Sequence, residues 1–586
     1  MEAGASRDAQ PAPRYSPSDV ERRRRLLRRG LPALGGLVLL ALVGGLLLGG
    51  GPGGAERATA KRYATLWAQG DYGRMYALLD GAARARTSFQ DFAAAYRAAA
   101  ETATLGSLVV GKVGNRSGDA IPVMLLLRTR VFGLVHGTLE LPVSGSGDAM
   151  RVAWRPNAVF PGLGSGQQLT RQTALPVRAT LLARDGTVLA AGSDRHSAAP
   201  AVSAEIVGSL EPAPDDEAGE LRALGYPPGA LVGSSGLEHV FETELAGQPG
   251  GTLTAGDRVV ARSVPRAAPP VRTTISPALE QAAITALAGR YGGVAALDPR
   301  SGEVLALAGV AFSALQPPGS TFKIVTLTGA LESHVAQPQT TFPVEDATFL
   351  AGVRLENANG ESCGGTLVNA FANSCNSVFA PLGARLGARR LVDVAQRYGF
   401  NEQPTIPGAQ ESTIPSANAI GDDLAVGSSA IGQGLVQATT LEMTVVAATV
   451  ADDGLRPIPT LQLGQRPRFV RVTRPPVARE VARMMRAVVA YGTGTAAAIP
   501  GAQVAGKTGT AEIADTVPPA DQEQQQAQTD APPIPRTDAW FVAFAPSKRP
   551  RIAVGLLFPE AGAGGDVAAP AARGVLAAAL QHPASG

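Results

Sequence analysis

The chain has 586 residues, of which 45% are hydrophobic and 17% are charged, and its formal net charge at neutral pH is only +3. This length predicts three or four domains, and the nearly balanced, interspersed charges argue against nucleic-acid binding. Two cysteines are too few for a disulfide scaffold or a four-cysteine zinc site, and the five histidines lie far apart, so we expect neither a metal nor a cofactor.

The N-terminal region combines a basic run with an apolar stretch. Six arginines lie between Arg22 and Arg29, and residues 31–50 are uncharged and long enough to span a bilayer as a helix. Because basic residues favour the cytoplasmic side, we expect a cytoplasmic tail at residues 1–30, a single transmembrane helix at 31–50, and the rest of the chain outside the cytoplasm at the cell membrane. The alternative is a cleaved signal peptide, although its apolar region is normally only about 7–15 residues long.

The next segment changes its periodicity partway along. Residues 55–101 place apolar side chains at helical spacing, and residues 106–160 alternate as strands do. Helices followed by a sheet predict a small α+β domain over residues 55–163.

A second predicted domain, residues 166–284, follows a glycine-rich break. Residues 177–190 predict two strands around a turn at Asp185 and Gly186. Residues 198–219 are rich in alanine, proline and acidic residues, which favours a loop or a solvated face.

A larger domain is predicted for residues 285–586. Residues 294–307 predict a β-hairpin, residues 540–544 and 552–558 read as strands, and residues 567–581 as an alanine-rich helix. Residues 515–537 are rich in proline, glutamine and aspartate and predict a mobile surface loop.

A serine and a lysine stand three residues apart after a proline–proline–glycine break. Ser320 precedes an apolar run that predicts a helix, so it lies near a helix N-terminus, where free N–H groups favour negative charge. Lys323 is one turn further on the same face, so its amine can reach the Ser320 hydroxyl. Its apolar neighbours predict burial, which favours a neutral amine able to accept the serine proton. The alternative is an ordinary polar lysine at a helix start, because Ser-x-x-Lys alone is a weak signal.

A second lysine opens the sequence Lys507-Thr508-Gly509-Thr510. Lysines number only five among the 52 basic residues, so a retained lysine marks a position where arginine cannot serve. The segment reads as a strand with a glycine where a ligand can approach the backbone. The alternative is an edge strand carrying a solvated lysine.

A third pair, Ser374 and Asn376, offers a hydroxyl and an amide two residues apart. Ser-x-Asn is common, and Ser416 and Asn418 repeat it, but an apolar helix follows only the first pair, so we favour Ser374. Cys375 lies inside this pair, and outside the cytoplasm it can form a disulfide with Cys363. The sequence leaves open whether it does.

These three motifs, in this order, resemble the active site of penicillin-binding proteins and serine β-lactamases. Residues 317–323, 432–434 and 440–443 are similar to the class B, high-molecular-weight penicillin-binding proteins, and residues 236–247 resemble their pedestal segment. The resemblance implies a multidomain α+β chain. It would consist of the transmembrane helix, an NTF2-like domain (55–163), a pedestal or dimerisation domain (166–284) and a transpeptidase domain (285–586) with an antiparallel sheet between helical layers.

The resemblance also implies a role for each catalytic residue. Ser320 would attack the carbonyl between two D-alanines of a peptidoglycan stem peptide, with Lys323 as general base. Ser374 and Asn376 would relay protons and hold the substrate amide. An amine of a second stem peptide would then attack the acyl-enzyme and form the cross-link.

Substrate binding is implied for the third motif. Lys507 and Thr508 would bind the terminal carboxylate, Gly509 would allow close approach to the backbone, and the N–H groups of Ser320 and Thr510 would form an oxyanion hole. β-Lactams would inhibit by mimicking the D-Ala-D-Ala end. The sequence contains no evident glycosyltransferase domain, so we expect cell-wall synthesis partners that include a glycosyltransferase.

Other functions remain open at this point. A D,D-carboxypeptidase or a β-lactamase would use the same residues, and a non-catalytic cell-wall scaffold would bind partners through residues 55–285. A Ser-His-Asp mechanism is disfavoured, because no Gly-x-Ser-x-Gly motif is present and His334 lies about four helical turns from Ser320.

Overall fold

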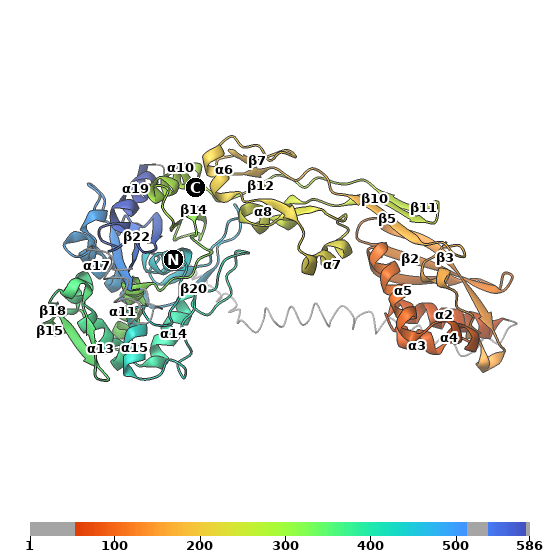
Figure 1. Cartoon of the computed structure of the whole chain (residues 1–586), viewed down its shortest axis with the longest axis horizontal. Coiled ribbons are helices and arrows are strands. Elements are labelled where there is room, and N and C mark those ends of the chain that lie inside the picture. The colour runs from red at the N-terminus through yellow and green to blue at the C-terminus, as the bar shows by residue number, and fades with distance from the viewer. Residues whose placement is uncertain (1–52, 513–536, 582–586) are drawn as a thin grey trace, which may run out of the picture. The chain divides into compact units, whose positions relative to one another are not determined.

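The computed structural model describes residues 53–512 and 537–581 (Figure 1). The predicted cytoplasmic tail, the predicted transmembrane helix at 31–50 and the predicted loop up to residue 536 lie outside this part of the chain. Among the described helices, none is long and apolar enough to cross a bilayer. The chain divides into two compact units. The first unit contains the described residues up to Gln172 and the segment Thr252–Ser263. The second unit contains Thr173–Gly251 and the described residues from Val264 onwards.

The first unit confirms the predicted order of helices followed by a sheet. Its helices are α2 (Gly54–Ala68), α3 (Tyr72–Ala77), α4 (Gly81–Arg86) and α5 (Phe89–Thr102), and its main strands are β1 (Leu105–Val113), β2 (Ala120–Thr129), β3 (Gly133–Ser144) and β4 (Arg151–Val152). The four strands pair in sequence order. Side chains at helical spacing on α2 and α5 and alternate residues of β2 and β3 are buried in one core, as the two periodicities require.

Aromatic side chains fill the space between the helices and the sheet of this unit. The Tyr63 and Tyr96 hydroxyls lie 2.8 Å apart. Trp154 Nε1 donates to Tyr96 Oη over 3.2 Å, and Tyr96 donates to the Ala158 carbonyl over 3.1 Å. These bonds satisfy polar groups that burial would otherwise leave unpaired.

The second unit opens with small elements. They are β6 (Leu181–Leu182), β7 (Val188–Ala190), α6 (Pro200–Ile206), β8 (Leu210–Pro212), α7 (Asp215–Leu224), β9 (Leu231–Gly233), α8 (Gly236–Val240), α9 (Glu242–Leu245) and β12 (Val271–Arg272). Strands β5 (Leu169–Ala174) and β10 (Gly250–Ala255) are shared by the two units, and β11 (Arg258–Ser263) belongs to the first. The predicted hairpin is confirmed, because β6 and β7 pair antiparallel. Glu238 on α8 is 1% exposed and forms ion pairs with Arg178 and Arg195, which neutralise its buried charge.

The prediction of a loop or solvated face at residues 198–219 is wrong, since two helices form there. Pro200 occupies the first turn of α6, and Val202 and Ile206 are buried in the core of the unit. In α7 the first turn holds three acidic residues and Gly225 ends the helix in the left-handed conformation, so local electrostatics and capping stabilise a helix that has no buried residue.

A five-stranded antiparallel sheet organises the larger part of this unit. Its strands are β13 (Gly293–Leu297), β14 (Val304–Gly309), β21 (Ala505–Glu512), β22 (Thr537–Ala545) and β23 (Ile552–Phe558), in the order β14-β13-β23-β22-β21. The predicted hairpin and strands are confirmed. Every residue of β22 and β23 is buried, because helices cover both faces.

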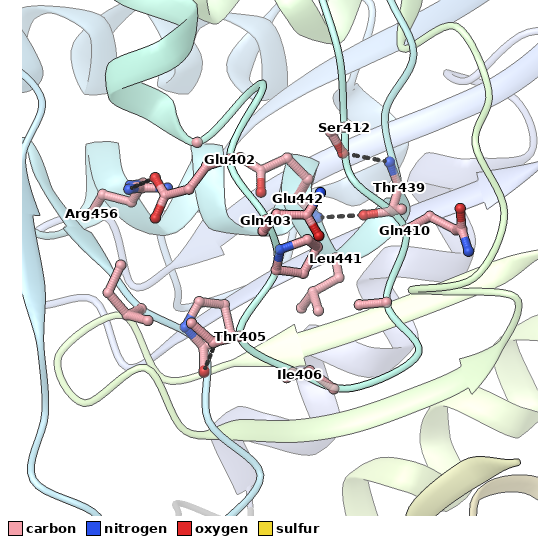
Figure 2. Close-up of a pocket in the computed structure, with 15 residues that line it drawn as sticks. Glu402, Gln403, Thr405, Ile406, Gln410, Ser412, Thr439, Leu441, Glu442 and Arg456 are labelled. Atoms are coloured by element: carbon pink, nitrogen blue, oxygen red, sulfur yellow. Dashed lines mark hydrogen bonds and ion pairs between the residues drawn. The ribbon is translucent and has the colours of Figure 1, made fainter. Parts of the chain in front are cut away.

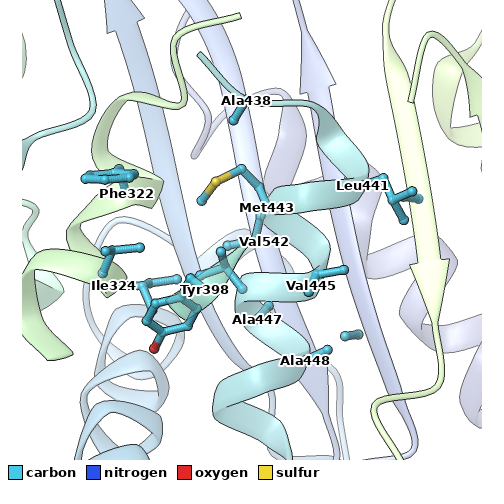
Figure 3. Close-up of a cluster of buried hydrophobic side chains, with 14 of the residues drawn as sticks. Phe322, Ile324, Tyr398, Ala438, Leu441, Met443, Val445, Ala447, Ala448 and Val542 are labelled. Carbon is cyan, nitrogen blue, oxygen red and sulfur yellow. The ribbon is translucent and has the colours of Figure 1, made fainter. Parts of the chain in front are cut away.

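Helices α10 (Pro277–Leu287) and α19 (Ala568–Gln581) pack on one face of the sheet. On the other face lie α11 (Lys323–Glu332), preceded by the 3-10 helix η3 (Gly319–Phe322), and α16 (Thr440–Ala451). Figure 3 shows Phe322 and Ile324 of this serine-bearing segment beside Met443 of α16, with Tyr398 close by. Packing on a rigid sheet therefore fixes the position of η3.

The remaining elements of this unit are β15 (Thr341–Glu345), β16 (Ala347–Leu350), β17 (Val353–Glu356), η4 (Ala358–Gly360), β18 (Cys363–Thr366), α12 (Leu367–Ala372), α13 (Asn376–Leu386), α14 (Ala388–Tyr398), α15 (Asp423–Ala430), β19 (Leu455–Pro457), β20 (Phe469–Arg471), α17 (Pro475–Ala490) and η5 (Thr495–Ala497). Of these, α13, α14, α15 and α17 contact α11.

Candidate active site

A cavity of about 1750 Å³ brings the three predicted motifs together at the β21 edge of the sheet. Ser320, Ser374, Asn376, Thr508 and Thr510 all line it. The two lysines of the motifs lie beneath its floor and are fully buried. The competing Ser-x-Asn pair at residues 416–418 does not contribute to its lining.

Two close backbone approaches hold Ser320 in place. Gly319 has a φ of 51°, and a Cβ at this position would lie 2.9 Å from the Thr510 carbonyl oxygen. On the opposite side its N–H donates to Gly432 O over 3.0 Å, and a Cβ on Gly432 would lie 2.1 Å from Gly319 O. Glycine is therefore required at both positions, and Ser320 is held between β21 and the turn at Gly432.

Lys323 lies in the first turn of α11 with its amine directed at the second motif. Its Nζ is 2.7 Å from the Ser374 carbonyl oxygen, 2.7 Å from Asn376 Oδ1 and 3.3 Å from Ser374 Oγ. Complete burial, reinforced by the positive charge of Lys507, lowers the pKa of the Lys323 amine well below its ordinary value. The predicted burial is confirmed, while among the described residues the amine hydrogen-bonds to Ser374 and Asn376 rather than to the Ser320 hydroxyl.

The turn that carries Ser374 has an unfavourable backbone conformation and is cross-linked at the next residue. Ser374 adopts a left-handed φ of 59°, which is unfavourable for a residue with a Cβ. Cys375, the next residue, is disulfide-bonded to Cys363 on β18 at a sequence separation of 12. The disulfide left open by the sequence therefore forms, and it ties this turn to the strand across the cavity wall.

Asn376 is held by its own side-chain amide. Its Nδ2 donates to the Glu356 carbonyl over 2.8 Å, which leaves Oδ1 to face the Lys323 amine. The next backbone N–H, from Ser377, donates to Asn357 Oδ1 over 2.8 Å. Strand β17 thus orients the start of α13.

Lys507, like Lys323, lies within hydrogen-bond distance of the Ser374 hydroxyl. Its Nζ is 2.9 Å from Ser374 Oγ and donates to the Thr508 carbonyl over 2.9 Å. Burial lowers the pKa of the Lys507 amine to about 7. The Ser374 hydroxyl consequently lies between two amines with depressed pKa values, an arrangement suited to proton transfer.

Gly509 permits tight packing behind the cavity. A Cβ on this residue would lie 2.8 Å from Trp540 Cβ and 3.0 Å from the carbonyl oxygen of Pro318. The strand can therefore lie directly against the turn that precedes Ser320, which places Thr510 beside the serine.

A second cavity in the same unit is much smaller, at about 50 Å³ (Figure 2). It is lined by Glu402, Glu442 and Arg456, and Figure 2 shows Arg456 paired with Glu402 at one end of it. Burial raises the pKa of Glu442 to about 7. None of the predicted catalytic or substrate-binding residues lines this cavity, and it is too small for a peptide.

Sequence reasoning did not single out several polar residues that line the large cavity, among them Thr493. Thr493, in the loop between α17 and η5, lines the cavity, and its Oγ1 lies 2.5 Å from Thr508 Oγ1. The flanking residues Gly492 and Gly494 were a signal for a backbone that packs closely against its surroundings.

Three family models match consecutive parts of the chain. Residues 55–167 match an NTF2-like N-terminal transpeptidase domain, residues 163–263 a penicillin-binding protein dimerisation domain, and residues 292–577 a penicillin-binding protein transpeptidase domain.

Curated proteins and solved structures agree with these matches. The peptidoglycan D,D-transpeptidase PbpA of Mycolicibacterium smegmatis is 33% identical over 381 residues, covering 53% of this chain and 72% of the relative. The crystal structure of the D,D-transpeptidase domain of a peptidoglycan glycosyltransferase from Eggerthella lenta is 29% identical, with a TM-score of 0.55, and covers 70% of this chain and 99% of its own. The penicillin G acyl-enzyme complex of penicillin-binding protein A from Mycobacterium tuberculosis is 27% identical, with a TM-score of 0.54, and covers 69% of this chain and 100% of its own.

Proposed function

The chain belongs to the penicillin-binding protein family of peptidoglycan D,D-transpeptidases, and we propose that it cross-links stem peptides through an acyl-enzyme on Ser320. One observation carries this proposal: Ser320, Ser374 and Thr508 line one cavity, and the amines of two buried lysines both lie within hydrogen-bond distance of the Ser374 hydroxyl. Comparison with the acyl-enzyme complex of the relative supports a covalent mechanism.

Lys323 is the general base of the proposed acylation. A neutral amine has two hydrogens and one lone pair, and the two carbonyl oxygens at 2.7 Å, of Ser374 and Asn376, take both hydrogens. The lone pair is then free to accept the proton of Ser320. Once Lys323 has taken the Ser320 proton, its ammonium can donate to Ser374 Oγ, which lies 3.3 Å away and also accepts from Lys507, and the Ser374 hydroxyl can pass its own hydrogen on.

In the acylation step, Ser320 Oγ attacks the carbonyl carbon between the two terminal D-alanines while its proton passes to Lys323. The C–N bond then breaks, the leaving D-alanine takes up a proton relayed through Ser374, and an ester remains on Ser320. The backbone N–H groups of Ser320 and Thr510 stabilise the negative oxygen that forms in between. The Thr508 hydroxyl, which lines the cavity, binds the terminal carboxylate, and the buried Lys507 ammonium behind it supplies attracting positive charge.

An amine of a second stem peptide completes the proposed reaction. Its nitrogen attacks the ester carbonyl, its proton passes to the same base, and the Ser320 hydroxyl is restored as the new amide forms. β-Lactams would acylate Ser320 in the same way because they present an amide and a carboxylate at the same spacing.

The N-terminal sequence supports a membrane-anchored enzyme. We propose that residues 31–50 form its transmembrane helix and residues 1–30 a cytoplasmic tail. Outside the cytoplasm lie the NTF2-like domain (55–163), the pedestal domain (166–284) and the transpeptidase domain (285–586). Glycan polymerisation would then require a glycosyltransferase partner.

The test is acylation of the purified full-length chain by excess benzylpenicillin, followed by intact mass, with Ser320→Ala as the control. The proposal predicts a lasting adduct of one penicillin per chain that Ser320→Ala abolishes. An adduct that disappears while penicilloate accumulates would identify a β-lactamase. No adduct at high drug concentration and long times would indicate a non-catalytic scaffold.

A further inference from the structure

The smaller cavity contains a glutamate that its own helix does not use. Glu442 lies in the first turn of α16 after the N-cap Thr439, in a Thr-x-x-Glu spacing where the carboxylate normally accepts the N–H of the N-cap residue. Here Ser412 Oγ accepts that N–H over 3.1 Å, while Thr439 Oγ1 accepts the Glu442 N–H over 3.1 Å (Figure 2). The buried Oε1 atom of Glu442 has no hydrogen-bond partner among the described residues. Its carboxyl group is therefore available to a ligand.

The chain supplies one positive charge for two carboxyl groups in this cavity. Of the residues that line it, Arg456 alone is basic, and Arg456 is paired with Glu402. A Cβ on Gly399 would lie 2.4 Å from Arg456 Nη1 and 2.6 Å from Glu442 Oε1. Because glycine has no Cβ, space remains between these two atoms, and no ion pair spans it within the part of the chain that the structure describes.

An ionised Glu442 is consequently a buried charge without a counter-ion of its own. Burial raises the pKa of its carboxyl to about 7. The positive charge of Arg456 acts against this rise and the negative charge of Glu402 adds to it, and these are the charged groups that face the carboxyl. A buried charge must be neutralised or paired, so Glu442 either takes up a proton or meets a second cation.

The cavity suits a small cation in both size and lining. Its volume of about 50 Å³ is room for one or two water-sized groups, since a water molecule occupies about 30 Å³ of the liquid. Ser412 and Thr439 line it beside Glu442, and each of their hydroxyls keeps a lone pair for a further donor. Ile406 and Ile458 add apolar wall that can contact a methyl group. None of its lining residues lines the active-site cavity, so the two sites are separate.

We propose that this cavity binds the ammonium group of a small primary amine, which donates to Glu442 Oε1 and supplies the second positive charge. The Nε of Arg456, which also lacks a partner among the residues described, would donate to a water molecule beside the amine. The inference is independent of the acyl transfer proposed for Ser320. It requires that a ligand carry a positive charge and N–H groups, and that Glu442 be ionised.

The test is binding of methylammonium to the full-length protein, measured by saturation-transfer NMR at constant ionic strength. Glu442→Gln keeps the shape of the side chain and removes its charge, and Glu217→Gln, which changes an exposed residue of α7, is the matched control. We expect Glu442→Gln to weaken binding about tenfold or more and the control to leave it unchanged. Because a proton and the amine compete for one carboxyl, wild-type affinity should rise about tenfold from pH 6 to pH 8, and Glu442→Gln should lose this rise.

Two further ligands test the chemistry of recognition. Methanol has no charge and tetramethylammonium has no N–H group, so neither should show saturable binding. Equal binding of tetramethylammonium, displacement by equimolar potassium, or an affinity that does not change with pH would overturn the proposal. No binding of methylammonium to the wild type would show that the cavity holds only water. The pH series on the wild type decides the matter even if Glu442→Gln fails to fold, and no outcome depends on penicillin acylation.

Discussion

The disulfide beside Ser374 should contribute measurably to both stability and acylation. It closes a loop at a sequence separation of 12, for which the chain-entropy relation gives about 3 kcal/mol of stabilisation. Cys363→Ala removes the bond but keeps the buried Cys375 thiol, so it isolates the loss of the cross-link. Cys375→Ala also removes a fully buried sulfur and should be less stable by about a further 1 kcal/mol.

The assay should report on the transpeptidase domain alone, because the chain contains two compact units. Short pulses of fluorescent penicillin at increasing urea concentration measure the fraction of chains that retain a folded active site. We expect Cys363→Ala to lower the urea midpoint by the equivalent of about 3 kcal/mol. In the absence of urea we expect acylation to slow about three- to tenfold, because the strained left-handed turn at Ser374 is no longer tied to β18. Dithiothreitol should reproduce both changes in the wild type and have no effect on Cys363→Ala. A midpoint and an acylation rate equal to those of the wild type would refute this reasoning.

Three further predictions concern protonation and relay. The pKa of Lys507 is about 7, and in the proposed reaction its positive charge attracts the carboxylate. The second-order rate of acylation by benzylpenicillin should therefore fall as the pH rises above 7, and Lys507→Arg should remove this alkaline limb of the pH profile. Burial raises the pKa of the Glu280 carboxyl to about 8, from 4.5 in the unfolded chain. Between these two pH values the native state holds a proton that the unfolded chain releases. The free energy of unfolding therefore decreases as the pH rises from about 4.5 to 8. Glu280→Gln should therefore reduce the slope of the unfolding free energy against pH by about 1.4 kcal/mol per pH unit. The prediction is wrong if Glu280→Gln shifts the urea midpoint, relative to the wild type, by the same amount at pH 5 and at pH 7.5. Ser374→Ala should slow acylation by about 10²- to 10⁴-fold in stopped-flow measurements, and a loss below tenfold would exclude a relay role for this hydroxyl.

The local chemistry of the motifs was predictable because it depends on neighbours in the sequence. The proline–proline–glycine break placed Ser320 at a helix start, and the apolar residues around Lys323 predicted the burial that lowers its pKa. The all-buried strands β22 and β23 were recognisable from continuous apolar runs.

Other features depend on contacts that the sequence does not display. Helix α7 has no buried face, so apolar periodicity could not reveal it, and only its acidic first turn and terminal Gly225 pointed to a helix. The Thr493 hydroxyl contacts that of Thr508, which is 15 positions away and adjacent only in the folded chain. Likewise, the raised pKa of Glu280 arises from its burial under β14, where Leu307 donates to its carboxyl oxygen.

Transfer of an acyl group from Ser320 to an amine is the central claim, and partitioning between amine and water measures it directly. The full-length protein would be incubated with a thioester analogue of an acyl-D-Ala-D-Ala peptide and increasing concentrations of a D-amino acid acceptor, with both products quantified by mass spectrometry. The account predicts that the transfer product increases with acceptor concentration at the expense of the hydrolysis product, and that Ser320→Ala forms neither. Hydrolysis alone at every acceptor concentration, or turnover that persists in Ser320→Ala, would contradict it.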